Sequence, residues 1–217
     1  MPQGPLKVAL FGSYYRGLHV LDELLNGPLK AQVQVVGVAT DDPGNGFISR
    51  EKRVWQYPHT QEEASMVMNL ARDNGISVYT GRVKTPAFYE IFENAWAPEY
   101  CIMATFGQRI DDRLFNYPDR GFYNLHPSDH SDWPSRYAGG NPFHHLMQDG
   151  AKECFMTLHH VDGGFDTGAR VCVSSPITIP DDASVPDMHR LSSPVAAMLV
   201  RHHLQQLLDA RKSHFHV

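Results

Sequence analysis

The first forty residues contain the pattern that most limits how this chain can fold. Residues 8–11 form a short apolar run that ends at Gly12. Leucines then recur at helical spacing from Leu18 to Leu25, and residues 33–40 (VQVVGVAT) form a second apolar run. A strand, a helix and a second strand in this order make a crossover unit whose two strands run parallel. The sequence therefore predicts an α/β fold.

Later segments continue the alternation of helices and strands. The predicted helices cover residues 62–74, 86–95, 142–148 and 187–211. The predicted strands cover residues 76–79, 100–104, 121–126, 154–160 and 170–174. Loops or turns are predicted at residues 43–58, 127–128 and 129–141. After residue 121 strands follow one another directly, which predicts an antiparallel or mixed edge on a mostly parallel sheet. No internal repeat appears, so we expect one domain over residues 1–217.

Composition excludes several classes of protein. The chain has 19 Lys and Arg against 24 Asp and Glu, a net charge of −5, whereas proteins with a large phosphate footprint are usually basic. No apolar run approaches the roughly 20 residues of a membrane span, and the N-terminus lacks the layout of a signal peptide. Cys101, Cys154 and Cys172 are far apart, which argues against a disulfide framework. We expect a cytoplasmic protein that binds neither nucleic acid nor membrane.

The turn after the first strand, Gly-Ser-Tyr-Tyr-Arg-Gly at residues 12–17, is a candidate ligand contact. It has neither the G-x-G-x-x-G spacing of dinucleotide-binding proteins nor the GK[ST] of a phosphate loop. A nicotinamide dehydrogenase is therefore disfavoured, because only the Rossmann-like start of the chain and Asp41 suggest one. The following helix still offers free N–H groups to an anion. A plain turn and a direct ligand contact both fit the sequence at this point.

Asn124 and His126 form a second candidate, at the end of a predicted strand. Residues two apart in a strand face the same way, and open α/β sheets bind ligands at the carboxyl ends of their strands. An amide donor beside a titratable imidazole suits a reaction in which an oxyanion develops. A structural role for both side chains is the alternative.

Residues 159–168 (HHVDGGFDTG) form a glycine-rich loop with two carboxylates. Asp162 or Asp166 in such a loop can lie against an imidazole, raise its pKa and fix its orientation. An ordinary Asx turn is the alternative. The adjacent histidine pairs 144/145, 159/160 and 202/203 diverge in direction on a helix or strand, so we expect no metal site.

Taken together, Asn-x-His-Pro-Ser at residues 124–128 and Asp-x-Gly-x-Asp-Thr-Gly near residues 162–168 resemble the folate-dependent formyltransferase family. That family includes glycinamide ribonucleotide, methionyl-tRNA and amino-sugar formyltransferases. The resemblance covers most of the chain and implies a Rossmann-like formyltransferase fold, a mostly parallel twisted sheet with helices on both faces.

The resemblance also implies roles for individual residues. It assigns catalysis to Asn124, His126 and Asp166. It assigns the donor 10-formyltetrahydrofolate to two segments, Phe106, Gly107, Gln108, Arg109 and Ile110 in one and Asp162, Gly163, Gly164 and Phe165 in the other. The acceptor is expected to contact Ser13, Tyr14, Tyr15, Arg16 and Arg136, with Lys52, Arg53, Trp55 and Tyr57 as further loop candidates.

The implied reaction moves a formyl group from this donor to an amine. The nitrogen of the amine attacks the formyl carbon, and His126 and Asn124 stabilise the oxygen that becomes negative. Asp166 is expected to orient His126, favour its charged form and help to move the proton from the attacking nitrogen. No metal is required, because the donor is already activated.

The acceptor is expected to be a small molecule. Residues 129–133 depart from the family pattern on the acceptor side, and residues 12–16 replace the phosphate loop of the glycinamide ribonucleotide enzymes. The sequence also ends without the basic C-terminal domain of the methionyl-tRNA enzymes. An amino sugar or an amino acid such as N-hydroxyornithine is therefore favoured. The alternatives are a formyltetrahydrofolate hydrolase, a glycinamide ribonucleotide formyltransferase and a relative that only binds its ligand. The terminal helix is expected either to form a homodimer or to pack within the chain.

Overall fold

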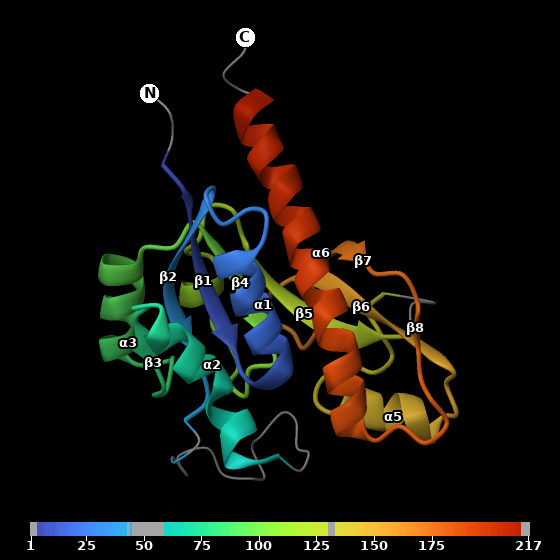
Figure 1. Cartoon of the computed structure of the whole chain (residues 1–217). Coiled ribbons are helices and arrows are strands. Elements are labelled where there is room, and N and C mark those ends of the chain that lie inside the picture. The colour runs from blue at the N-terminus through green and yellow to red at the C-terminus, as the bar shows by residue number, and fades with distance from the viewer. Residues whose placement is uncertain (1–3, 43, 45–58, 130–132, 214–217) are drawn as a thin grey trace.

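The computed structural model describes residues 4–42, 44, 59–129 and 133–213, and its centre is an eight-stranded sheet (Figure 1). The strands are β1 (Leu6–Gly12), β2 (Val33–Ala39), β3 (Val78–Tyr79), β4 (Tyr100–Ala104), β5 (Phe122–Ser128), β6 (Glu153–His160), β7 (Arg170–Val173) and β8 (Ile177–Thr178). Their order is β3-β2-β1-β4-β5-β6-β7, and β8 pairs with β6. Strands β1 to β5 are parallel, whereas β6 pairs antiparallel with β5, β7 and β8. The predicted α/β fold with an antiparallel edge is confirmed.

Helices cover both faces of this sheet. They are α1 (Tyr14–Asn26), α2 (Gln61–Asp73), α3 (Pro86–Glu90) with the π-helical turn η2 (Ile91–Trp96), α4 (Asp112–Phe115), α5 (Pro142–Gln148) and α6 (Val185–Ser213). Figure 1 shows α1, α2 and the long α6 together on one face, and Phe88 of α3 packs against Phe11 of β1 on the other face. Within the described residues, no helix is both long enough and apolar enough to cross a membrane.

The alternation of side chains along β1 explains the two layers. Val8 and Leu10 pack in one apolar cluster with side chains of α1, α2 and α6. Phe11 points to the other face and lies in a second cluster with the rings of Phe88 and Trp96. Because successive side chains of a strand face opposite ways, one apolar strand needs a helical layer on each side.

Strand β5 is longer than the sequence predicts. The predicted turn at residues 127–128 lies within β5, where Pro127 and Ser128 pair with β6. The pairing of β5 with β4 ends earlier, at Asn124. Proline lacks an N–H, so it is tolerated in a strand where one edge is unpaired. The same divergence of β4 and β5 leaves space beside the end of β5.

Other elements differ from expectation at their ends. The predicted helix 86–95 changes to a π-helical turn at Ile91, and the strand predicted over 76–79 is reduced to Val78–Tyr79. Helix α4 and strand β8 were not predicted, because two to four residues are too few to show a period. The predicted loop 43–58 lies outside the described residues apart from residue 44.

Candidate functional site

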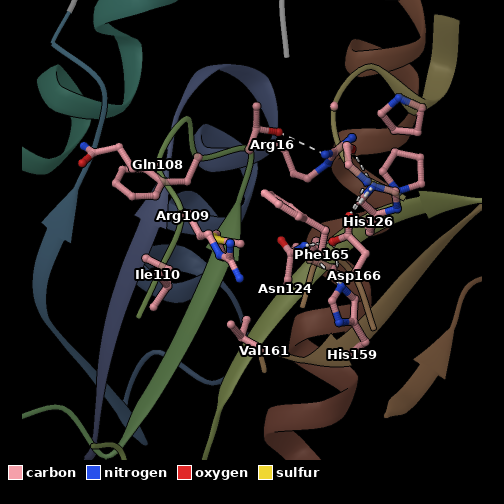
Figure 2. Close-up of a pocket in the computed structure, with 18 of the residues that line it drawn as sticks. Arg16, Gln108, Arg109, Ile110, Asn124, His126, His159, Val161, Phe165 and Asp166 are labelled. Carbon is pink, nitrogen blue, oxygen red and sulfur yellow. Dashed lines mark hydrogen bonds and ion pairs between the residues drawn. The ribbon is translucent and has the colours of Figure 1, made fainter. Parts of the chain in front are cut away.

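A cavity opens at the carboxyl ends of β4 and β5, beside the point where those strands separate (Figure 2). Its volume is about 880 Å³ including its mouth. The wall comes from the segment after β4, the end of β5, the loop before α5 and the loop after β6, with Arg16 of α1 and His189 of α6. Open α/β sheets usually bind small molecules at the edge where their parallel strands end, and this cavity is large enough for such a ligand.

Asn124 and His126 lie on the same side of β5, as their spacing predicts, and both line the cavity. Each side chain is buried. Asn124 Nδ2 donates to Asp166 Oδ1 over 2.9 Å. His126 Nε2 lies 3.2 Å from Asp166 Oδ2 and 3.1 Å from the carbonyl oxygen of Gly139. The loop after β6 therefore brings the predicted carboxylate against both predicted side chains of β5.

Asp166 is the charge at the centre of this arrangement. Its backbone φ is 52°, an unusual value for a residue other than glycine, and Gly139 N donates to its Oδ2 over 2.7 Å. Burial by itself raises the pKa of Asp166, but the hydrogen bond with His159, the nearby His126 ring and the Gly139 N–H together lower it to about 2. The carboxylate is therefore ionised at neutral pH.

Two opposing effects act on the charge of the His126 ring. Burial of the ring lowers the pKa of His126 below the ordinary 6.5 and outweighs the opposing effect of Asp166. Asp166 favours the charged form of the ring, as expected, but the cost of burying the charged ring is larger, so the net shift of the pKa is downward. Both neighbours of Nε2 are acceptors, so Nε2 carries the proton in the neutral ring. Nδ1 is buried and has no hydrogen-bond partner among the described residues.

His159 is a further residue of the site that sequence reasoning did not single out. Its Nε2 lies 3.2 Å from Asn124 Nδ2 and 3.4 Å from Asp166 Oδ1, and its Nδ1 donates to the His160 carbonyl over 2.7 Å. The ring also packs against Trp133, with centroids 4.8 Å apart. His159 pairs with Asn124 in the register of β5 and β6. Only the register of the two strands could have identified His159, and the sequence of either strand alone does not give that register.

The two segments predicted to hold the donor face each other across the cavity. Phe106, Gln108, Arg109 and Ile110 line it from one segment, and Asp162, Gly164 and Phe165 line it from the other. Gly107 and Gly163 are not among its lining residues. An Arg109 amino group donates to the Gly163 carbonyl, and the guanidinium carbon lies 4.8 Å from the centre of the Phe165 ring. Arg109 therefore ties the two segments together.

Among the described residues that were predicted to contact the acceptor, Arg16 alone lines the cavity. The others contact protein groups outside it. Ser13 Oγ donates to Asp41 Oδ2, the Tyr14 hydroxyl lies 3.1 Å from His59 Nε2, and the Tyr15 hydroxyl donates to Glu63 Oε1. Arg136 is 64% exposed and pairs with Asp129. Residues 52, 53, 55 and 57 lie outside the described part of the chain.

The described residues include no group of three or more His, Cys, Asp or Glu side chains that could hold a metal ion.

Known proteins resemble the chain over nearly its whole length. A family model described as "Formyl transferase" matches residues 6–202. Methionyl-tRNA formyltransferase of Thermus thermophilus is 29% identical over 188 residues, which are 86% of this chain and 55% of that protein. Methionyl-tRNA formyltransferase of Syntrophus aciditrophicus (strain SB) is 31% identical over 132 residues, 60% of this chain and 40% of that protein. The chain thus spans about half the length of these relatives.

Solved structures share the fold at lower identity. Phosphoribosylglycinamide formyltransferase from Streptococcus pneumoniae TIGR4 has a TM-score of 0.65 at 16% identity, covering 93% of this chain and 98% of that one. A formyltetrahydrofolate deformylase from Pseudomonas syringae pv. tomato has a TM-score of 0.70 at 20% identity, covering 97% of this chain and 63% of that one.

Proposed function

The chain belongs to the formyl transferase family, and from that premise we propose that it transfers a formyl group from 10-formyltetrahydrofolate to the amine of a small molecule. The observation that carries the proposal is the placement of the His126 ring in the cavity wall. Its Nε2–H is fixed by Asp166 and Gly139, and its buried Nδ1 has no partner among the described residues. A buried acceptor atom in a cavity wall is suited to receive a proton from a ligand.

The cavity has features that suit the donor. Phe106, Ile110, Val161 and Phe165 supply apolar surface, and Gln108 and Asp162 supply polar groups among them. A flat heteroaromatic ring with a polar edge, such as a pterin, fits this mixture of surfaces. The donor supplies a formyl carbon that is already bonded to a nitrogen leaving group.

The residues of the chain then have distinct tasks. When an amine adds to the formyl carbon, His126 Nδ1 accepts a proton from the attacking nitrogen and later gives one to the departing nitrogen. Asp166 fixes the ring through Nε2 and stabilises the imidazolium while it exists. Asn124 has two amide hydrogens, and Asp166 Oδ1 takes one at 2.9 Å. The second, near His159 Nε2 at 3.2 Å, is the one that we propose turns to the developing oxyanion.

The acceptor is proposed to be a small amine, with amino sugars and hydroxylated amino acids such as N-hydroxyornithine as the two classes to test. Relatives named for methionyl-tRNA and a fold neighbour named for phosphoribosylglycinamide act on other amines, and another neighbour is named as a deformylase. Water in place of the amine would make the same site a hydrolase.

Isothermal titration with 5-formyltetrahydrofolate, the stable isomer of the donor, tests the first half of the proposal, with NAD as the control. We expect saturable folate binding and no response to NAD. Assays with 10-formyltetrahydrofolate and a panel of amines then separate transfer from hydrolysis. Folate binding with release of formate and no formylated amine would identify a hydrolase, and absence of folate binding would refute the donor.

A further inference from the structure

Helix α6 packs against the core through one face and is partly apolar on the other. Ala196 and Leu204 are buried in the core. Leu191 and Met198 lie on the outer side of the helix and are 47% and 55% exposed. Among the described residues, the other exposed large apolar side chain is Phe165, at the cavity. The outer face of a surface helix is normally polar, and exposed apolar patches mark contact sites, so the middle of α6 is a candidate interaction surface.

Four residues form a continuous apolar row on this outer side. Leu191, Pro194, Val195 and Met198 follow one another at steps that place them along one face of a helix. Leu191, Pro194 and Met198 are exposed, and Val195 is partly buried. We call these four residues the α6 stripe. Figure 1 shows α6 running beside α1 along the outside of the sheet, so the stripe is open to a partner.

The two ends of the α6 stripe carry different polar groups. Toward the N-terminus the outer side continues with Asp187, whose side chain is 48% exposed. Its neighbour Arg190 pairs with it and turns toward Glu63 of α2. Toward the C-terminus the outer side continues with Arg201, which is 36% exposed, and with the exposed His202. A carboxylate therefore lies beyond one end of the stripe, and groups that carry or accept a proton lie beyond the other.

We propose that the α6 stripe is the contact between two copies of this chain, with the two α6 helices antiparallel across a two-fold axis at Pro194 and Val195. A two-fold contact must be self-complementary, because the same surface serves both copies. Leu191 lies three residues before Pro194, and Met198 lies three residues after Val195. In the antiparallel pair, Leu191 of each copy therefore packs against the partner subunit's Met198. The proposal is independent of formyl transfer.

Charge selects the antiparallel arrangement over the parallel one. In the antiparallel pair, Asp187 lies opposite the partner subunit's His202 and near the partner subunit's Arg201, so a carboxylate meets groups of complementary character. A parallel pair would place the two Asp187 carboxylates against each other, which opposes association. The short side chains of Pro194 and Val195 at the axis allow the two helices to approach closely.

The size of the stripe sets the strength of the association. Residues 191–198 cover about two turns of each helix. A contact of this length is smaller than the interface of a permanent dimer. We therefore expect monomers and dimers in an equilibrium that depends on protein concentration.

Analytical ultracentrifugation over a concentration series measures this equilibrium. Leu191→Glu and Met198→Glu should each raise the dissociation constant of the dimer at least about thirtyfold, because each dimer would then bury two carboxylates in an apolar contact. Gln206→Glu is the matched control, since it adds the same charge to the exposed side of the same helix beyond the stripe, and its dissociation constant should match the wild type. Thermal unfolding shows that each variant is folded, because substitutions at exposed positions change stability little.

Two double variants test the register. Leu191→Glu with Met198→Lys places opposite charges against each other in the antiparallel pair, whereas Leu191→Glu with Met198→Glu places like charges there. We expect the first to associate at least about tenfold more tightly than the second, and the difference to shrink in about 1 M salt. In a parallel pair each position would meet itself, so both double variants would have two pairs of like charges and would associate equally.

Three results would overturn the proposal. A wild type that stays monomeric up to about 1 mM would show that the stripe does not bind a second copy, and would leave it to a different partner. A dimer that both single variants leave intact would place the interface elsewhere on the surface. Equal association of the two double variants would exclude the antiparallel register. None of these results changes the proposed formyl transfer, which is assayed separately.

Discussion

Asp166→Asn removes the charge of the central carboxylate and keeps its shape. In the wild type that carboxylate lies 3.2 Å from His126 Nε2 and 3.4 Å from His159 Nε2. Its pKa is about 2 in the folded protein, against an ordinary value of 3.8. A difference of this size corresponds to about 2 kcal/mol of folding free energy at neutral pH. We expect Asp166→Asn to be less stable than the wild type by about that amount at pH 7.

The dependence on pH separates this charge effect from a packing defect. The folded-state pKa is the lower one, so the carboxylate stabilises the fold above pH 3.8 and loses this contribution as the pH falls through 2. The stability gap between wild type and Asp166→Asn should therefore narrow by about 1 kcal/mol between pH 7 and pH 3.

Urea unfolding at a series of pH values measures the gap. Asp181→Asn is the control, because Asp181 is 87% exposed and pairs with Lys152 at the surface, where ion pairs contribute little. We expect its unfolding free energy to match the wild type throughout. A gap for Asp166→Asn that stays constant or widens as the pH falls would refute the electrostatic account of the site.

Three further predictions concern the pH profile, the core and the donor segments. The pKa of His126 lies below 6.5, and we propose the neutral ring as the proton acceptor, so kcat/KM should be flat at neutral pH and fall only as the pH drops below 6.5. A fall in kcat/KM that already begins above pH 7 as the pH is lowered would contradict this. Gly37→Ala should lower the free energy of unfolding by about 3 kcal/mol, measured in urea, because a Cβ there would overlap the buried Trp96 ring. Arg109→Ala should raise the folate dissociation constant about tenfold in titration, with thermal unfolding unchanged, because its contact with Gly163 joins the two donor segments. An unchanged dissociation constant would remove Arg109 from the donor site.

The sequence predicts the fold correctly in those segments that are long enough to show a clear hydrophobic period. The crossover formed by β1, α1 and β2 combines apolar runs with helical leucine spacing, and the structure has each element in place. The π-helical turn η2 was not predicted, because residues 91–96 keep the composition of an ordinary helix. Ser128 was expected in a turn because proline usually ends a strand. Only the early end of the β4–β5 pairing makes Pro127 acceptable there.

The candidate site was predicted in part. The shared direction of Asn124 and His126 follows from strand geometry, and Asp166 was found through the family motif. His159 was missed because only the antiparallel register places it opposite Asn124. The turn after β1 was expected to contact the acceptor as a group, but the start of a helix sends successive side chains in different directions. Arg16 therefore reaches the cavity while Tyr15 bonds to Glu63 on α2.

The measurement that tests the central claim most directly is the single-turnover rate of formyl transfer by His126→Ala, beside its affinity for 5-formyltetrahydrofolate. If His126 Nδ1 carries the proton, the rate should fall at least about a hundredfold while the folate dissociation constant stays within a few-fold of the wild type. A wild-type rate in His126→Ala with folate bound normally would contradict the proposed role of this residue.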